Sequence, residues 1–299
     1  MKKSEIPNEP PDAKVIALVL LLACLWGGNS VSIKIGLQDI PPLALAVLRF
    51  LLGFLVIAIW SLTRHIRIRM NRGELFPMVL LTGIFLAQII ALNIGTHLTS
   101  ASRSTILVST YPFFTALFAH LLVPGDRLSV PKTLGLILAF GGVALTFAGN
   151  FQLSTRDHLL GDVIVLASGC LLGLRVVVTK LMIQTIHPYR LLIWLMILSL
   201  PCFLGLSLFF EKGATYQFSV SSVAAILYQG VVIAGFCFLS WTSVLRKYSP
   251  SKLVVLFFTT PLFGVLLSYL LMGDEMNLSL IGGVVLVACG IYLVNKKPR

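Results

Sequence analysis

The feature that most constrains this chain is the recurrence of apolar segments long enough to cross a lipid bilayer. A transmembrane helix needs about 20 mainly apolar residues. The 299 residues are 57% hydrophobic and only 11% charged, whereas a soluble domain carries about 25% charged residues. The sequence therefore predicts an all-α membrane protein with ten transmembrane helices. Their approximate ranges are 15–36, 42–63, 75–97, 101–123, 132–149, 161–182, 188–210, 220–244, 252–272 and 279–295.

Basic residues are distributed unequally between the two ends of these segments. If the N-terminus is cytoplasmic, 17 of the 23 Lys and Arg residues lie on the cytoplasmic side. Cytoplasmic loops of membrane proteins carry such an excess of Lys and Arg. We therefore expect both termini in the cytoplasm. The same asymmetry accounts for most of the net charge of +12 without a nucleic-acid partner.

The two halves of the chain repeat one pattern of residues. The pattern recurs 146 to 149 residues further along, in the pairs Gly27 and Gly173, Lys34 and Lys180, Pro42 and Pro188, Thr110 and Thr259, Pro112 and Pro261, and Asp126 and Glu275. Each half contains five spans, and an odd number makes the second half enter the membrane from the opposite side. We predict two inverted five-helix repeats, 15–149 and 161–295, with a linker at 150–160 and tails at 1–14 and 296–299.

A polar stripe interrupts the first apolar segment. On a helix, Trp26, Asn29 and Ser30 share one face with Ile33. Small and polar residues on a transmembrane helix either pack neighbouring helices or line a polar pathway. The repeat places Asn29 opposite Arg175, near the midplane, which favours cavity lining for Trp26 and Asn29.

Arg49 and Arg175 are the charged residues deep within the spans. A guanidinium group there costs at least about 2.5–3.5 kcal/mol and must find carbonyls, water or an anion. For Arg49 we favour a structural role, bonding to carbonyls or reaching the interface. Arg175 is either an anchor for a substrate carboxylate or a packing and gating charge. No Asp or Glu lies deep in a span, which argues against ion coupling through a buried carboxylate.

Other polar side chains complete the candidate substrate site. It comprises Trp26, Asn29, Ser30, Gln88, Thr105, Ser109, Tyr111, Arg175 and Tyr228. Bonding within or between helices is the alternative for the hydroxyl and amide members. Trp241 is expected at the membrane interface rather than at a ligand. The prolines Pro112 and Pro261 are expected mid-span, as kinks or hinges, with Thr110 and Thr259 satisfying freed carbonyls.

Several function classes lack support in this sequence. The five cysteines lie in apolar segments without paired spacing and suggest small hydrophobic residues rather than a metal site. No catalytic motif or credible Ser/His pair is present, so we expect neither an enzyme nor a bound cofactor or metal. A channel would need rings of charge or carbonyl groups, usually from several subunits.

A set of motifs in both halves resembles a known transporter family. The motifs are Trp26-Gly27, Lys34, Pro42, Arg49, Thr110-Tyr111-Pro112, Gly125-Asp126-Arg127-Leu128, Gly161-Asp162, Lys180, Pro188, Ser249-Pro250-Ser251, Pro261 and Glu275. Their order and spacing are similar to the drug/metabolite transporter superfamily and its EamA-like ten-helix exporters. The resemblance departs at Asp126, where Glu is usual, and at Lys252, where small residues are common.

The resemblance implies alternating-access transport of small metabolites, often amino acids. We expect an exporter of amino acids or related carboxylate-bearing compounds. An exchanger of anionic metabolites, phosphorylated or carboxylated, is the alternative; the near isolation of Arg175 favours a single carboxylate. The expected partners are a small-molecule substrate and the lipid bilayer. Short tails and the lack of a targeting segment suggest a bacterial inner membrane, and the sequence leaves monomer and homodimer open.

Overall fold

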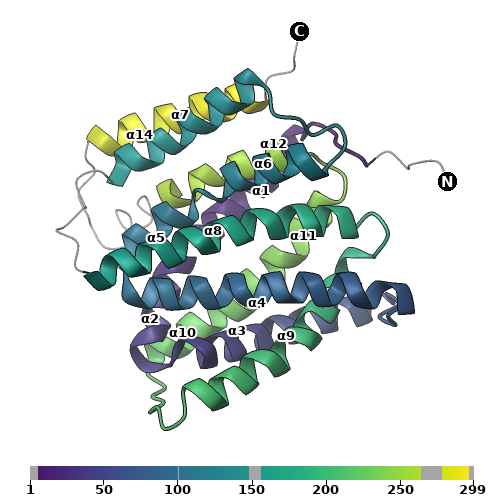
Figure 1. The fold of residues 1–299 in the computed structure, drawn as a ribbon, viewed down its shortest axis with the longest axis vertical. Coiled ribbons are helices and arrows are strands. Elements are labelled where there is room, and N and C mark those ends of the chain that lie inside the picture. Colours follow the sequence, from purple (N-terminus) through teal and green to yellow (C-terminus); the bar gives the residue numbers. More distant parts are fainter. Residues whose placement is uncertain (1–5, 100, 148–155, 264–277, 296–299) are drawn as a thin grey trace.

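The protein is an all-helical bundle in a computed structural model that describes residues 6–99, 101–147, 156–263 and 278–295 (Figure 1). The described residues contain no strand, only an isolated parallel bridge between Glu9 and Tyr248. Most of the predicted linker, residues 1–5 of the N-terminal tail, the whole C-terminal tail 296–299 and Glu275 lie outside the described residues.

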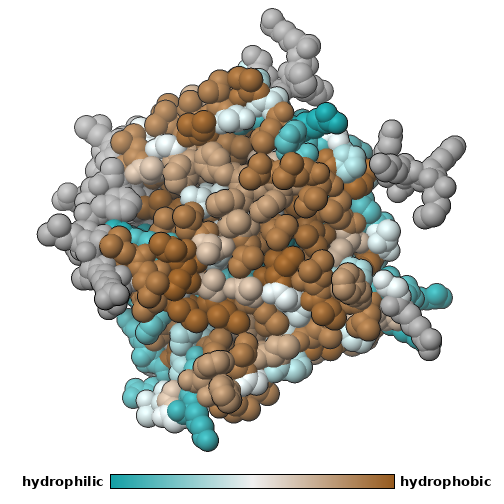
Figure 2. Space-filling model, in the orientation of Figure 1, coloured by the Kyte–Doolittle hydropathy of each residue, from teal (hydrophilic) through white to brown (hydrophobic). Residues whose placement is uncertain are grey.

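Six helical segments are long and apolar enough to cross a membrane: Ala13–Asp39, Pro42–Thr63, Leu75–Leu98, His158–Met182, Pro188–Phe210 and Val220–Leu245. Four apolar helices in the described residues are shorter: Ile106–Leu122, Val130–Leu145, Pro250–Phe263 and Gly282–Asn295. Hydrophobic side chains cover the middle of one face, and hydrophilic side chains gather toward its edges (Figure 2). These features make the chain a multi-pass membrane protein.

Five helices match predicted apolar segments closely: α3 (Pro42–Thr63), α4 (Leu75–Leu98), α7 (Val130–Phe147), α9 (Pro188–Phe210) and α14 (Leu278–Asn295). Helix α8 (Arg156–Met182) begins five residues before its predicted segment, and other segments are interrupted. The first segment divides at Gly28 into α1 (Ala13–Gly27) and α2 (Asn29–Asp39). The fourth divides into α5 (Ala101–Val108) and α6 (Tyr111–Leu122). The eighth comprises α10 (Val220–Leu227), a π-helix (Tyr228–Cys237) and α11 (Phe238–Leu245).

We had expected Pro112 to kink the middle of a helix, but the structure places it elsewhere. It lies in the first turn of α6, where a backbone N–H has no intrahelical acceptor and proline is well tolerated. Thr110 donates its hydroxyl hydrogen to the carbonyl oxygen of Leu107 at 2.7 Å. In the second half Thr259 makes the corresponding bond to Leu256 at 2.6 Å, within the turn that follows α12 (Pro250–Val254).

The fifth predicted span of one half packs against that of the other half through glycine. Helices α7 (Val130–Phe147) and α14 (Leu278–Asn295) lie side by side at one edge of the bundle (Figure 1). A Cβ atom on Gly290 would lie 2.4 Å from the carbonyl oxygen of Gly135. Close backbone approach through small residues is a common way to associate helices in lipid.

A lysine binds three carbonyl oxygens at each end of the bundle; Lys180 is buried and Lys34 is half-buried. The Lys34 ammonium group donates to Thr96, His97 and Thr99, at 3.0–3.2 Å, where α4 ends. The Lys180 ammonium group donates to Pro7 at 2.5 Å, to Arg246 at 3.2 Å and to Tyr248 at 3.0 Å, where α11 ends. Each lysine thereby satisfies carbonyl groups that lack intrahelical partners at a helix C-terminus.

The N-terminal segment is tied to the Lys180 end of the bundle. Besides the Lys180 bond to Pro7, the Asn8 amide donates to the carbonyl of Pro124 at 2.7 Å. The Ser249 N–H donates to the carbonyl of Glu9 at 3.1 Å. Residues 7–9 thus join the α6–α7 turn to the α11–α12 connection.

The Asp126 carboxylate organises the turn beside this segment. It is buried, and accepts hydrogen bonds from Lys132 at 2.6 Å, from Ser249 at 2.8 Å and from both the N–H and the hydroxyl group of Ser251. Burial raises the pKa of Asp126, but Lys132 and the Ser251 bonds outweigh that effect and hold the pKa below its ordinary 3.8.

We predict that Asp126→Asn lowers the free energy of unfolding by about 3 kcal/mol, because it removes a buried charge that pairs the half-buried Lys132. The ionised carboxylate stabilises the fold fully above the ordinary pKa of 3.8, and this contribution is lost as pH falls through the lowered native pKa. Unfolding in mixed micelles from pH 7 to pH 3 measures the difference, which should shrink below about pH 4. Asp12→Asn, at the N-cap of α1, is the matched control and should change little. A difference independent of pH would contradict the prediction.

Candidate functional site

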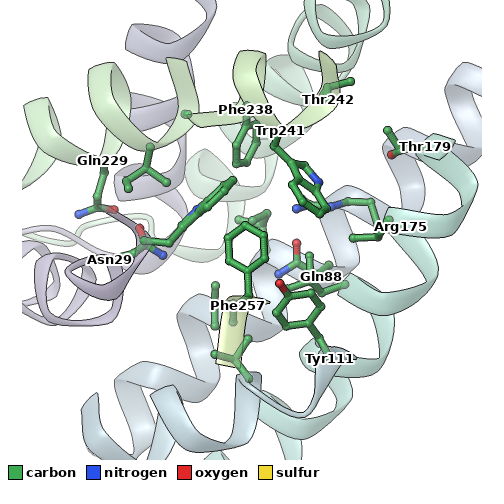
Figure 3. A pocket seen from close by; sticks show the side chains of 18 of the residues that line it. Asn29, Gln88, Tyr111, Arg175, Thr179, Gln229, Phe238, Trp241, Thr242 and Phe257 are labelled. Carbon is green, nitrogen blue, oxygen red and sulfur yellow. The ribbon is translucent and has the colours of Figure 1, made fainter. Parts of the chain in front are cut away.

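A cavity of about 160 Å³ lies within the bundle, between the two halves of the chain (Figure 3). Its walls come from α1–α4 of the first half, from α8 and α9, and from the π-helix and α11. The turn before α6 and the segment 257–260 complete it. Helices are interrupted next to the cavity at Gly28, at Thr110 and along the π-helix.

Two guanidinium groups reach this cavity, and both are buried. Arg49 comes from α3 and Arg175 from α8, and the positive charge of Arg175 acts unfavourably on Arg49. The Nη1 atom of Arg49 donates to the Gln229 amide oxygen at 3.3 Å. Its Nε and Nη2 atoms, and Nη1 of Arg175, have no hydrogen-bond partner in the described chain. These donors are available to an anionic group.

Aromatic rings lie against both guanidinium groups. Arg49 lies over Phe50 at 4.5 Å, and Arg175 lies 5.1 Å from the ring centre of Phe85 and 5.5 Å from that of Phe238. A cation over an aromatic face gains about 2 kcal/mol or more when it is desolvated. These contacts offset part of the cost of two buried cations and leave hydrogen-bond donors free.

Amide side chains add unused acceptors to the same cavity. The amide oxygens of Asn29 and Gln88 are buried and have no donor among the described residues. The Gln88 amide group donates to the Ser168 hydroxyl at 3.2 Å, which orients its oxygen away from that bond. Gln229 donates to the carbonyl of Ser32 at 2.9 Å and is held between Ser32 and Arg49. The wall thus offers acceptors as well as donors.

An aromatic group forms the apolar part of the cavity. Phe257 lies at its centre, with ring centres 5.3 Å from Trp26, 5.0 Å from Trp241 and 6.3 Å from Tyr111. Edge-to-face and tilted rings at these distances attract one another. Figure 3 shows Phe257, Trp241, Tyr111 and Arg175 extending toward the same space.

The backbone around Arg49 allows the π-helix to approach closely. A Cβ atom on Gly53 of α3 would lie 2.6 Å from the Ala234 side chain, and one on Gly230 would lie 2.5 Å from Leu52. This approach brings Gln229, Ile233 and Ala234 of the π-helix to the cavity. π-Helical turns occur frequently at functional sites.

Six of the nine predicted site residues line this cavity: Trp26, Asn29, Gln88, Ser109, Tyr111 and Arg175. Tyr228 is not among the lining residues, and its hydroxyl donates to the carbonyl of Leu25. The side chains of Ser30 and Thr105 lie outside the described part of the structure. Asn93 serves packing, since its amide donates to the carbonyl of Pro42 at 2.8 Å.

Our sequence reasoning missed several lining residues. Arg49, expected to be structural, reaches the cavity, as do Gln229, Phe238 and Phe257. Trp241, expected at the interface, packs edge-on against Phe257 inside. The signal for Arg49 was an arginine deep within a predicted span when no Asp or Glu lies at that depth in any span. The aromatic residues gave none, since phenylalanine in an apolar segment is equally suited to face lipid.

The chemistry of this wall suits a ligand with an anionic group, hydrogen-bond donors and an apolar portion. No Asp or Glu lines the cavity within the described residues, and these residues contain no cluster of metal-ligating side chains. The arrangement therefore provides binding groups but no carboxylate for acid–base chemistry.

Comparisons with known proteins agree with this architecture. The model of the EamA-like transporter family matches twice, over residues 13–148 and 159–296. The chain is 23% identical over 281 residues to YoaV, an uncharacterized transporter of Bacillus subtilis, covering 94% of this chain and 96% of that protein. It is 25% identical to a probable amino-acid metabolite efflux pump of Escherichia coli, covering 92% and 93% of the two chains.

A solved crystal structure shares the fold, with a TM-score of 0.80 at 17% sequence identity over 94% of this chain and 96% of the other. Both family matches together span most of the sequence, and the relatives align over nearly their full lengths. The chain therefore belongs to the EamA-like transporter family.

Proposed function

We propose that this transporter moves amino acids or related carboxylate-bearing metabolites by alternating access, in the direction of export. The observation that carries the proposal is the pair of buried guanidinium groups with unpartnered donors in a cavity that no described carboxylate lines. Planar guanidinium groups are suited to carboxylates, which accept two parallel hydrogen bonds.

The rest of the cavity wall supports a zwitterionic substrate. The free amide oxygens of Asn29 and Gln88 accept hydrogen bonds from an ammonium group, and the rings around Phe257 accept an apolar side chain. The name of the Escherichia coli relative, a probable amino-acid metabolite efflux pump, agrees with this substrate class.

The proposal includes a membrane arrangement. Ten helices form two inverted five-helix repeats, residues 15–149 and 161–295, with both termini in the cytoplasm of a cell whose inner membrane holds the protein. The two family matches, the paired Thr110 and Thr259 bonds, and the paired lysines Lys34 and Lys180 support the repeat. The gathering of basic loops supports the orientation.

Exchange of anionic metabolites is the second candidate, and one observation favours it. We had expected Arg175 to be nearly isolated, but Arg49 lines the same cavity. Two cations suit a phosphate ester or a dicarboxylate better than one does. For such a substrate, the amide oxygens of Asn29 and Gln88 accept hydrogen bonds from its hydroxyl groups. An enzymatic role has no support from the family or from the named relatives.

Competition for transport separates these candidates. In proteoliposomes preloaded with phenylalanine, labelled phenylalanine should enter by counterflow, and unlabelled phenylalanine should compete. Phenylalanine amide should fail to compete because it lacks the carboxylate, and N-acetylphenylalanine should compete weakly because it lacks the ammonium group. Stronger inhibition by a sugar phosphate than by any amino acid would favour the exchanger and overturn the zwitterion proposal.

We predict that Arg175→Ala weakens apparent substrate affinity by about tenfold to a hundredfold, since a hydrogen-bonded charge contributes about 1.5–3 kcal/mol. Arg175→Lys keeps the charge without the planar fork and should lose less. Concentration dependence of counterflow measures both variants. Lys212→Gln, on an exposed loop, is the control. Normal affinity in both Arg175 variants would contradict a role in substrate binding.

Membrane orientation is tested by labelling single cysteines in a cysteine-free background in intact cells. Thr215→Cys and Asn71→Cys both introduce exposed thiols, on loops at opposite ends of the bundle. An impermeant maleimide should label position 215 from outside and position 71 only after permeabilisation. The reverse pattern would place both termini outside.

A further inference from the structure

A second hollow lies on the outer surface of the bundle, away from the central cavity. It has a volume of about 320 Å³ and runs between α3 and α9, ending at the loop that follows α3. The apolar lining residues are Phe54, Ala58, Leu62, Ile68, Ile193, Trp194 and Ile197. A water molecule occupies about 30 Å³, so the groove has room for a stretch of hydrocarbon chain.

The walls of this groove belong to the membrane-facing surface. Leu62 is 61% exposed and Ile197 is 37% exposed, and both lie on apolar helices long enough to span a bilayer. Lipid therefore surrounds this position, and an apolar groove in such a surface fits an acyl chain.

One end of the groove carries positive charge. Arg69 lines it, and residues 66–70 alternate between half-buried and exposed, so that Arg67 and Arg69 point outward while Ile68 points inward. Arg64, on the same loop, lies over the ring of Trp60 at 4.9 Å. No described carboxylate forms an ion pair with Arg67 or Arg69.

The loop is held in place by contacts on its inner side. The Trp194 indole N–H donates to the carbonyl of Ile68 at 2.6 Å. Ile66 donates its N–H to the carbonyl of Ser61 at 3.1 Å, which folds the loop back onto the end of α3. Glu74, the nearby acid, is bound to Arg190 at 2.6 Å and is therefore already paired. These contacts hold the backbone that carries Arg67 and Arg69 beside the groove before any ligand binds.

We propose that this groove is a binding site for one anionic phospholipid. An acyl chain lies between α3 and α9, and the phosphate group binds Arg69, with Arg67 contributing charge. Basic pockets at the membrane surface recognise anionic head groups in this way, and guanidinium groups bind phosphate oxygens in pairs. The site is separate from that of the transported substrate, since the groove and the central cavity share no lining residue.

Native mass spectrometry of the purified protein tests this proposal, with phosphatidylglycerol and phosphatidylcholine of identical acyl chains as probes. We expect the wild-type protein to retain one phosphatidylglycerol at least tenfold more tightly than phosphatidylcholine. Arg69→Gln should reduce this preference several-fold, whereas Arg69→Lys should keep most of it. Arg127→Gln removes an exposed arginine elsewhere on the bundle and should leave the preference unchanged.

Filling the groove tests the acyl-chain part of the site. Ala58→Trp places a bulky ring in the groove and should weaken retention of both lipids, whereas Ala87→Trp, on the exposed side of α4, should not. Equal retention of the two lipids by the wild-type protein would overturn the proposal. So would a preference unchanged by Arg69→Gln, or retention unaffected by Ala58→Trp. Normal gel-filtration profiles of the variants would exclude misfolding as the cause of lost binding.

Discussion

The constraint on which this structure depends is that a helix that breaks or ends within a membrane protein needs partners for its freed backbone groups, because lipid supplies no donors or acceptors. Side chains from other segments meet this need in the described chain. Lys34 and Lys180 each bind three carbonyl oxygens, and the hydroxyl of Tyr228 binds the carbonyl of Leu25. Gln229 donates to the carbonyl of Ser32 within α2. The polar residues that the sequence suggests as the lining of a solute pathway thus fall into two groups. Some bond to the backbone of another segment, and others line the cavity.

That division explains why the cavity holds two unpaired cations. Gln229 donates its amide hydrogen to Ser32 within α2 and offers its oxygen to Arg49, and aromatic rings lie against both guanidinium groups. The donors without partners therefore belong to side chains that other contacts hold in place. Electrostatic repulsion between Arg49 and Arg175 makes the empty cavity less favourable than one holding an anion, which raises affinity for a negatively charged ligand.

The sequence predicts this fold well where apolar segments are uninterrupted and begin with proline. The segments 42–63 and 188–210 coincide with α3 and α9. It predicts less well where hydropathy conceals a break, as at Gly28 or in the π-helix, because hydropathy does not distinguish helix types. Polar residues such as Asn29 and Gln88 were found by their cost in lipid. Phe257 was not, since only packing decides which aromatic rings turn inward.

The N-terminal segment has a consequence for assembly of the chain. The backbone of Glu9 bonds to Lys247 and Ser249, which are synthesised only after about 240 further residues. Contacts of such high sequence separation form late in folding. The bond of Pro7 thus needs Lys180, at the end of the sixth predicted span, and the bonds of Glu9 are made only by a chain whose eighth predicted span has already been inserted. This segment leaves the ribosome before either half of the bundle is complete, and its bonds to Lys180, Lys247 and Ser249 form only in a molecule in which both halves have come together.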